Sequence, residues 1–527
     1  GIIVWVVRQK QNDSADYFLG GRDATWLAIG ASIFASNIGS EHLIGLAGAG
    51  ASSGMAMAHW EIQGWMILIL GWVFVPFYTR SMVYTMPEFL ERRYNPQSRT
   101  ILSVISLVSY VLTKVAVTVY AGGLVFQQVF GIKELWGIDF FWIAAIGLVV
   151  LTALYTIFGG MKSVLYTSVL QTPILLLGSL IILVLGFKEL GGWDEMMRVC
   201  GAVTVNDYGD TMTNLIRSND DANFPWLGAL IGSAIIGFWY WCTDQFIVQR
   251  VLSGKNEMEA RRGTIFGAYL KLLPVFLFLI PGMIAFALHQ KYIGAGGEGF
   301  LPMLANGTAN ADAAFPTLVA KLLPAGVKGL VVCGILAALM SSLASLFNSS
   351  AMLFTIDFYK RFKPETPEKK LVGIGQIATI VIVVLGILWI PIMRSVGDVL
   401  YTYLQDVQSV LAPGIAAAFL LGICWKRTSA QGGMWGLISG MVIGLTRLGA
   451  KVYYSNAGEV ADSTFKYLFY DMNWLFFCGW MFLFCIIVVI VVSLATEAPT
   501  AEKIQGLVFG TATKEQKAAT RASWNHW

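Results

Sequence analysis

The stretch that decides the fold is Ala35–Gly45, with the sequence ASNIGSEHLIG. It places an amide, a carboxylate and an imidazole inside a segment that is otherwise apolar enough to cross a bilayer. Ionisable groups at membrane depth are energetically costly and usually face a cavity or a solute path. Gly39 and Gly45 allow the helix to unwind here, and unwound backbone persists at that depth only where it lines a cavity or is buried in protein. The stretch therefore predicts a solute-binding site in a transport protein.

The composition extends the membrane prediction to the whole chain. Of the 527 residues, 56% are hydrophobic and 13% are charged, and the mean hydropathy is +0.65. A soluble domain carries roughly 25% charged residues. We therefore expect a polytopic membrane protein in contact with the lipid bilayer, with about a dozen spans of roughly 20 residues. The six cysteines lie mostly in apolar segments, which argues against a disulfide framework. The chain opens on an apolar stretch that we interpret as the end of a helix.

Positive charge orients the predicted spans. Lys and Arg concentrate in alternate connections, such as residues 80–99, 250–262 and 360–370, whereas the opposite loops at 188–225 and 289–325 are sparser although they are longer. The positive-inside rule places the first set in the cytoplasm. The basic clusters are thus topological determinants, and no nucleic-acid partner is expected. The thirteen apolar segments lie at about 1–8, 25–51, 54–78, 100–130, 136–158, 163–187, 226–249, 264–288, 326–356, 371–393, 400–425, 431–451 and 472–495.

The order of these segments indicates an internal repeat. Five segments after the one that holds Ala35–Gly45, segment 226–249 is again interrupted by Gly232 and Gly237, followed by FWYWCTDQ. Because five is odd, the second group runs inverted to the first, and matching interrupted helices in inverted halves point to a transporter's binding site. The predicted domains are a partial first helix with a cytoplasmic loop (1–24), a first repeat (25–187), an outer loop (188–225), an inverted second repeat (226–425), additional helices (426–496) and a cytoplasmic tail (497–527).

Several polar and aromatic residues in these segments are not explained by packing. A sugar presents hydroxyl groups, each a donor and an acceptor, around a ring with apolar faces, and carboxylate, amide and ammonium groups beside Trp or Tyr suit it. The alternative, which stays open, is that Glu61 and Lys271 form a structural ion pair. Asp244 and Arg250 are interpreted as a structural or gating ion pair. The candidate solute-binding residues are Asn37, His42, Glu61, Tyr240, Trp241, Lys271 and Gln405, with Glu41 beside them.

A second group of polar residues lies at Ser341–Ser349 (SSLASLFNS). Small and hydroxyl-bearing residues at helical spacing are often only close-packing surfaces in membranes. The functional alternative is a sodium site, since a hard cation prefers oxygen ligands and an unwound helix frees backbone carbonyls. The hydroxyls of Ser341 and Ser342 and the carbonyls of Ala35, Ile38 and Ala338 would then form the cage.

At this point the chain resembles the sodium/solute symporter family, and within it the sodium/glucose cotransporters. The resemblance rests on five stretches spread over most of the chain: ADYFLGGR (15–22) continuing to Gly45, YTMPEFL (84–90), FWYWCTDQFIVQR (238–250), SSLASLFNS (341–349) and FLLGICWKR (419–427). It implies an all-α membrane fold of two inverted five-helix repeats (LeuT-like) with extra flanking helices, and alternating access around a central site.

The resemblance also implies roles for particular residues. The sugar contacts and the sodium ligands are those named above, with Tyr240 as an inner gate and Tyr401 as an aromatic on the outer side of the sugar. Relatives often carry Asp where this chain has Ser168, and members that move two sodium ions tend to have Thr at Ala344. This implies one sodium ion per sugar. At Gly237 some relatives have a polar residue near the sugar.

The function expected from these observations is sodium-coupled symport of a monosaccharide, glucose or galactose. The alternatives are a sodium symporter for another solute such as myo-inositol, and a sodium-independent channel or sensor. An enzyme is not expected, because the four histidines show no metal-ligand spacing and no nucleophile motif is present. The outer loops lack the cysteine clusters of animal members, which favours the plasma membrane of a bacterium, its inner membrane. The sequence does not predict an oligomeric state.

Overall fold

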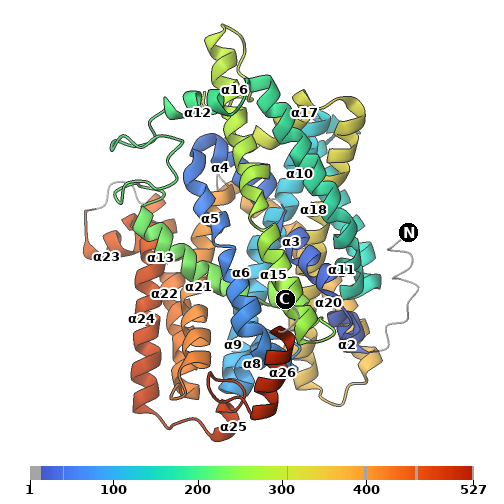
Figure 1. Cartoon of the computed structure of the whole chain (residues 1–527), viewed down its shortest axis with the longest axis vertical. Coiled ribbons are helices and arrows are strands. Elements are labelled where there is room, and N and C mark those ends of the chain that lie inside the picture. Colours follow the sequence, from blue (N-terminus) through green and yellow to red (C-terminus); the bar gives the residue numbers. More distant parts are fainter. Residues whose placement is uncertain (1–12, 40, 305–306, 397–399, 457–460, 525–527) are drawn as a thin grey trace.

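The structure, a computed structural model, describes residues 13–39, 41–304, 307–396, 400–456 and 461–524, and the side chains of 112–113, 392–406, 455–456 and 524 are not described (Figure 1). The described chain is almost entirely helical, and its one pair of strands is a short hairpin of β1 (Glu134–Leu135) and β2 (Ile138–Asp139). The all-α prediction is therefore confirmed.

The helices follow one another along the chain with π-helical and 3₁₀ turns between them. Those of the first part are α2 (Ser14–Leu19), η1 (Gly20–Arg22), α3 (Trp26–Asn37), η2 (Glu41–Leu46), α4 (Ala47–Ser52), η3 (Gly54–Met57), α5 (Ala58–Ile62), α6 (Trp65–Ile69), η4 (Leu70–Phe74), α7 (Val75–Ser81), α8 (Met86–Arg93), α9 (Pro96–Ser109), η5 (Tyr110–Val115), α10 (Ala116–Phe130), α11 (Phe140–Leu190) and α12 (Trp193–Gly201).

The second part begins after a loop that contains α12. Its elements are α13 (Trp226–Gly237), η6 (Phe238–Thr243), α14 (Gln245–Leu252), α15 (Glu257–Leu270), η7 (Val275–Leu279), α16 (Ile280–Gly294), η8 (Ala311–Ala313), α17 (Ala314–Leu322), α18 (Ala325–Met352), η9 (Leu353–Tyr359), α19 (Lys360–Phe362), α20 (Glu368–Val396), α21 (Leu400–Cys424), α22 (Ala430–Asn456), α23 (Thr464–Lys466), η10 (Tyr467–Asp471), α24 (Trp474–Ala495), α25 (Ala501–Ile504) and α26 (Lys514–Trp524).

Eight helices in the described part of the chain are long and apolar enough to cross a membrane. This number is smaller than the thirteen predicted segments, of which 1–8 lies outside the described residues. The predicted segments 136–158 and 163–187 continue as α11 and are separated only by a kink at Gly160 (φ 52°, ψ −150°). Other predicted segments form helices that are shorter, such as α3 and α10.

The first predicted helix break is present. Helix α3 ends at Asn37, Ile38 has an extended backbone (φ −77°, ψ 93°), and helical structure resumes at Glu41. Gly39 is required there because a Cβ atom would lie 2.6 Å from Oγ of Ser342 on α18. The prediction that Gly45 also unwinds is wrong, since Gly45 lies inside η2.

The second break lies at a different residue from the one predicted. Gly232 and Gly237 remain helical in α13, and the helix is interrupted at Asp244 (φ −75°, ψ 129°), between η6 and α14. The carboxylate of Asp244 accepts a hydrogen bond from the backbone N–H of Phe246 and so caps α14. The two glycines instead allow neighbours to approach, Leu475 at Gly232 and Gln63 at Gly237.

The broken helices lie in the interior of the bundle. Helix α3 packs against α15, α11 and α18, while α11 packs along α18. Helices α21, α22 and α24 pack against one another, and α24 with α22 lies at one side of the molecule in Figure 1. The tail predicted for 497–527 contains α25 and α26, and α26 packs against α15.

Candidate functional site

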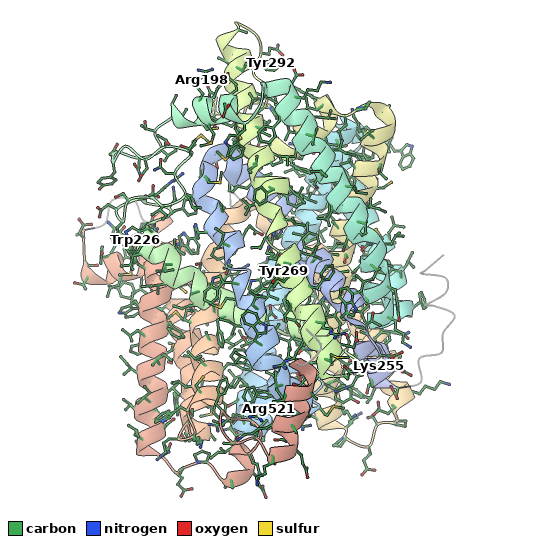
Figure 2. All side chains as sticks on the ribbon, viewed as in Figure 1. Arg198, Trp226, Lys255, Tyr269, Tyr292 and Arg521 are labelled. Atoms are coloured by element: carbon green, nitrogen blue, oxygen red, sulfur yellow. The ribbon has the colours of Figure 1, made fainter. Side chains whose placement is uncertain are left out.

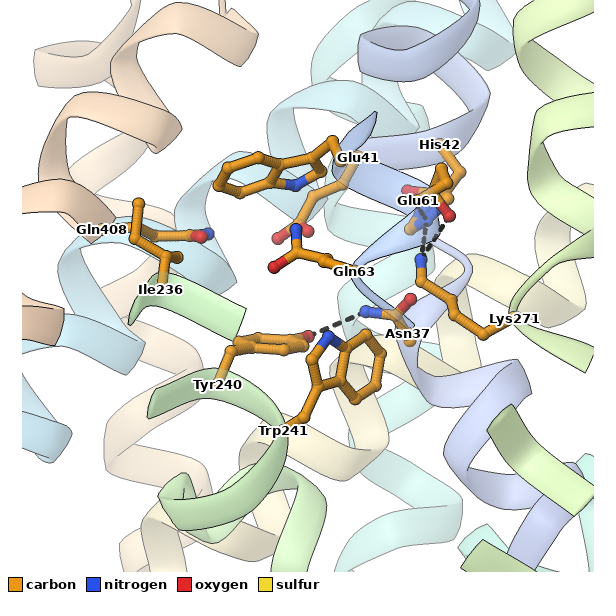
Figure 3. Close-up of a pocket in the computed structure, with 11 residues that line it drawn as sticks. Asn37, Glu41, His42, Glu61, Gln63, Ile236, Tyr240, Trp241, Lys271 and Gln408 are labelled. Carbon is orange, nitrogen blue, oxygen red and sulfur yellow. Dashed lines mark hydrogen bonds and ion pairs between the residues drawn. The ribbon is translucent and has the colours of Figure 1, made fainter. Parts of the chain in front are cut away.

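A pocket at the broken helices collects most of the predicted solute-binding residues (Figure 3). Its volume is about 20 Å³, close to the space that one water molecule needs. The side chains must therefore move apart before a six-membered ring can enter. The pocket is lined by Asn37, Glu41, His42, Trp60, Glu61, Gln63, Ile236, Tyr240, Trp241, Lys271 and Gln408.

Three charged or ionisable side chains meet on one side of this pocket. The ammonium of Lys271 lies 2.6 Å from Oε2 of Glu61 and 2.6 Å from Nε2 of His42, and this same Nε2 lies 3.2 Å from Oε1 of Glu61. All three side chains are buried, although they come from α5, η2 and the end of α15. The ion pair between Glu61 and Lys271 is thus present, and removing either partner would leave the other charge uncompensated.

A second polar pair faces the first across the pocket. The side-chain amide of Asn37 donates a hydrogen bond of 2.9 Å to the hydroxyl of Tyr240, as Figure 3 shows. The ring of Trp241 lies edge-on to Tyr240, with centroids 4.8 Å apart, and the Lys271 ammonium lies 5.5 Å from the Trp241 ring. The pocket therefore combines aromatic faces with amide, carboxylate and ammonium groups.

Three polar side-chain atoms in this pocket have neither a hydrogen bond nor an ion pair among the described residues. They are Oδ1 of Asn37, Oε1 of Gln63 and Nδ1 of His42, and all three are buried. A buried acceptor without a partner is destabilising. Oδ1 of Asn37 and Oε1 of Gln63 can therefore accept hydrogen bonds from a solute that carries several donors, whereas Nδ1 of His42 accepts or donates according to the tautomer of the ring.

The sequence analysis missed four lining residues: Trp60, Gln63, Ile236 and Gln408. Helical spacing could have found one of them, since Gln408 lies one turn after Gln405. Tyr401 and Gln405 lie on α21, as Gln408 does, but their side chains are outside the described residues.

The predicted sodium ligands come from α3 and α18, which pack against each other. At this crossing the Ser342 hydroxyl donates a 2.8 Å hydrogen bond to the carbonyl oxygen of Ser36, and the hydroxyls of Ser341 and Ser168 lie 3.3 Å apart. Ala35, Ile38 and Ala338 are buried on the same two elements. The arrangement brings hydroxyl oxygens next to the break in α3, where backbone carbonyls lose their helical partners.

The predicted ion pair between Asp244 and Arg250 is wrong. Asp244 pairs with Lys114 on η5, at 2.7 Å, and also accepts a hydrogen bond from the hydroxyl of Tyr110. Arg250 donates from Nε to the hydroxyl of Ser36, 3.1 Å away. The break after η6 is thus tied to η5, while Arg250 reaches the end of α3.

Comparison with known proteins gives a family match and relatives that are similar over most of this chain. A family model described as "Sodium:solute symporter family" matches residues 17–440. The chain is 36% identical over 518 residues to "Sodium/myo-inositol cotransporter 2" of Homo sapiens, covering 96% of this chain and 76% of the relative. It is 37% identical over 525 residues to "Sodium/myo-inositol cotransporter" of Canis lupus familiaris, covering 95% and 72%.

Two solved structures share the fold. One is a Na⁺-coupled sialic acid symporter in a substrate-bound outward-open state, with a TM-score of 0.75, 22% identity, and coverage of 95% of this chain and 96% of that one. The other is Mhp1, a nucleobase-cation-symport-1 family transporter in a closed conformation, with a TM-score of 0.53, 15% identity, and coverage of 94% and 98%.

Proposed function

Because this chain belongs to the sodium:solute symporter family, we propose that the solute which it moves with sodium is a cyclic polyol such as myo-inositol. Sodium-coupled symport across a membrane follows from the family and from relatives above 30% identity, which the match covers over more than two thirds of their length. The chain is accordingly a multi-pass transporter and not an enzyme, with sodium as its coupling ion.

The choice of solute departs from the glucose or galactose predicted first. The relatives compared above are sodium/myo-inositol cotransporters, which favours the alternative named in the sequence analysis. The observation that carries the proposal is the pair of unpartnered acceptors on Asn37 and Gln63. A carbocyclic polyol carries a hydroxyl donor at every ring carbon, whereas the ring oxygen of a hexopyranose can only accept.

In this proposal the solute lies between the charged cluster of His42, Glu61 and Lys271 and the aromatic pair of Tyr240 and Trp241. Lys271 donates to hydroxyl oxygens, Glu61 accepts from hydroxyls, and Trp241 covers an apolar ring face. Tyr240, held by Asn37, closes the cytoplasmic side. Tyr401 and Gln405 on α21 would contact the solute from the outer side.

Sodium is proposed to bind at the crossing of α3 and α18. The ligands would be the hydroxyls of Ser341 and Ser342 and the carbonyls of Ala35, Ile38 and Ala338. An ion there would tie the broken helix to α18 and so stabilise an outward-open state, because separate parts of the chain share its coordination. Loss of the ion on the cytoplasmic side would then release the solute.

Two further assignments belong to the same proposal. Residues 25–187 and 226–425 are taken as the inverted repeats, linked by 188–225, preceded by 1–24 and followed by 426–496 and 497–527. The plasma membrane of a bacterium stays the proposed location, although the relatives compared above come from mammals.

Uptake into proteoliposomes tests the solute assignment. Labelled myo-inositol and labelled glucose would be supplied separately, each with an inward sodium or potassium gradient. We expect sodium-dependent uptake of myo-inositol that unlabelled glucose inhibits weakly. Sodium-dependent uptake of glucose in preference to myo-inositol would contradict the polyol assignment and leave the symport intact. Equal uptake with both cations would contradict the coupling.

A further inference from the structure

A second pocket lies at the Lys/Arg-rich end of the molecule and shares no lining residue with the solute pocket. It has a volume of about 300 Å³ and lies where η1, the end of α7 and the start of α15 meet. Lys255, one of its lining residues, is labelled in the lower part of Figure 2, as is Arg521 of the tail helix α26. The positive-inside rule assigns this end to the cytoplasm.

Three cationic side chains line the pocket: Arg22, Arg80 and Lys255. Glu257 is the one carboxylate among its lining residues, and it already faces Arg261 at 3.8 Å and accepts a hydrogen bond from the Ser523 hydroxyl. The charge of the lining is therefore positive. A pocket that concentrates guanidinium and ammonium groups favours an anion with several acceptor oxygens, such as a phosphate.

The three cationic side chains differ in how many hydrogen bonds hold them in place. Nη2 of Arg22 donates to the carbonyl oxygens of Met82 and Val83, each at 3.0 Å, which fixes its guanidinium beside the pocket. Arg80 is held by α26 through Gln516 and Thr520, while its Nε is buried without a partner among the described residues. Lys255 is exposed, and no hydrogen bond or ion pair joins its ammonium to another described residue. The pocket thus offers donors that the protein itself leaves unused.

The backbone at this pocket is strained. Among the described residues, three that are not glycine have positive φ, and two of these, Arg22 (52°) and Met82 (49°), line this pocket. Such conformations are energetically unfavourable for residues with a Cβ, and they persist where the surrounding structure enforces them, often at ligand sites. The two residues are also in contact, because Nη2 of Arg22 donates to the carbonyl oxygen of Met82.

Exposed apolar residues lie on the elements that adjoin the pocket along the chain. Trp26 and Leu27, at the start of α3, are 39% and 43% exposed, and Trp72 on η4 is 44% exposed. These residues belong to elements that continue from the pocket into the membrane-spanning region. A ligand with a phosphate in the pocket can therefore lay apolar chains along this surface.

We propose that Arg22, Arg80 and Lys255 form a binding pocket for the phosphate group of an anionic lipid of the cytoplasmic leaflet. Basic pockets at the cytoplasmic side of membrane proteins bind such headgroups, and the leaflet supplies them at high local concentration. The lipid would link η1 and the end of α7 with the start of α15, which lies in the other half of the chain. A free phosphate ion has the same headgroup chemistry, and the experiment separates these two sources.

Native mass spectrometry of the full chain in detergent tests the proposal. Phosphatidic acid, phosphatidylcholine and inorganic phosphate would each be titrated against the unaltered protein, Lys255→Gln and Arg80→Gln. We expect phosphatidic acid to bind in preference to phosphatidylcholine, and Lys255→Gln to weaken its binding about fivefold. Lys370→Gln is the matched control, because it removes an exposed lysine at the start of α20, outside the pocket.

The other results each overturn the proposal in a defined way. Equal binding of phosphatidic acid to the unaltered protein and to both pocket variants would place the lipid elsewhere. Competition by inorganic phosphate at equal concentration would make a soluble phosphate the ligand. Because Arg80 also holds α26, its substitution can loosen the tail, and Lys255→Gln then carries the test alone.

Discussion

At the scale of single residues, the solute pocket is defined by what its buried groups lack as well as by what they contact. Lys271 compensates Glu61 and touches His42, so this cluster is satisfied electrostatically. Asn37 and Gln63 each keep a buried acceptor without a partner among the described residues. The first group explains why the site can fold in a low-dielectric interior, and the second explains how it can recognise hydroxyls.

Removing the Lys271 ammonium tests whether compensation of the Glu61 charge stabilises the site. Lys271→Ala should abolish solute uptake and lower stability by about 3–5 kcal/mol, because Glu61 is left as an uncompensated buried charge. The double variant Lys271→Ala with Glu61→Gln should regain stability but not uptake. Uptake assays and thermal unfolding of the purified protein measure the two effects separately. Normal uptake by Lys271→Ala would remove this residue from the solute site.

A substitution at Gly237, which faces Gln63, tests whether the unpartnered acceptors recognise the hydroxyls of the solute. A Cβ atom at position 237 would lie 2.5 Å from Oε1 of Gln63, so Gly237→Ala must displace this side chain. Losing one hydrogen bond to the solute should raise the KM for solute by about tenfold, with the sodium dependence unchanged.

The matched control for this substitution is Gly147→Ala, since a Cβ atom there meets nothing within 4 Å. Combining Gly237→Ala with Gln63→Ala relieves the clash, and the added effect of the alanine at 237 should then disappear. If Gly237→Ala leaves the KM unchanged, Gln63 does not contact the solute.

At the scale of elements, the sequence predicts the break in α3 better than the break after α13. The first break carries its own signal, because polar residues and Gly39 interrupt an apolar run and Gly39 faces Ser342 at close range. The second occurs at Asp244, a residue that caps the following helix, whereas the glycines before it serve packing. Composition does not distinguish a glycine that unwinds a helix from one that admits a neighbour. Residue spacing also does not predict the partner of Asp244, because Lys114 lies on a distant segment of the chain.

The crossing of α3 and α18 leads to a prediction about sodium. Ser342→Ala removes a hydroxyl that reaches the Ser36 carbonyl at the break, and it should weaken the apparent affinity for sodium by about tenfold or more. Preference among solutes should stay the same, because Ser342 does not line the solute pocket. Uptake measured against sodium concentration checks this. Ser439→Ala on α22, whose hydroxyl bonds within its own helix and to Cys485, is the control. An unchanged sodium affinity would contradict the site.

A short element between α16 and α17 leads to a prediction about pH. Burial raises the pKa of Asp312 on η8 to about 6, from an ordinary value of 3.8, and a Cβ atom at Gly48 of α4 would lie 2.6 Å from its Oδ1. The fold thus favours the protonated carboxyl. This contribution to stability is complete below the unfolded-state pKa and is lost as the pH rises through about 6.

Across pH 4 to 7, Asp312→Asn should therefore flatten the dependence of the melting temperature on pH between about 4 and 6, the interval between the unfolded and folded pKa, and raise the melting temperature above about pH 6. Thermal unfolding over that range measures both effects. Asp194→Asn, which alters an exposed carboxylate on the outer helix α12, should change neither. A steeper pH dependence in Asp312→Asn would contradict the assignment.

At the scale of the whole molecule, the tail connects parts of the bundle that are distant in sequence. Arg261 on α15 donates to the Ser523 hydroxyl on α26 at 2.6 Å and also to backbone carbonyls of η4. Leu507 and Val508 are buried, and the Phe509 ring packs against Phe77 on α7. Only a few residues of the tail make these contacts, and most of the tail is polar. Its composition therefore does not predict that it packs against the bundle.

The energetics of coupling lead to the last prediction, that one sodium ion moves with each solute molecule. The proposed site uses neutral oxygens. Of the neighbouring residues, Ser168 adds one hydroxyl and Ala344 adds none, and neither carries a carboxylate. One sodium ion crossing about 100 mV releases roughly 2.3 kcal/mol, and a tenfold gradient adds about 1.4 kcal/mol. Together they sustain a solute gradient of roughly 500-fold, so a single ion suffices for uptake. The reversal potential of solute-coupled current at several sodium gradients measures the ratio, and a Hill coefficient for sodium near 1 should accompany it. A ratio of two would require a second ion site and would show that oxygens other than those of the α3–α18 crossing also bind sodium.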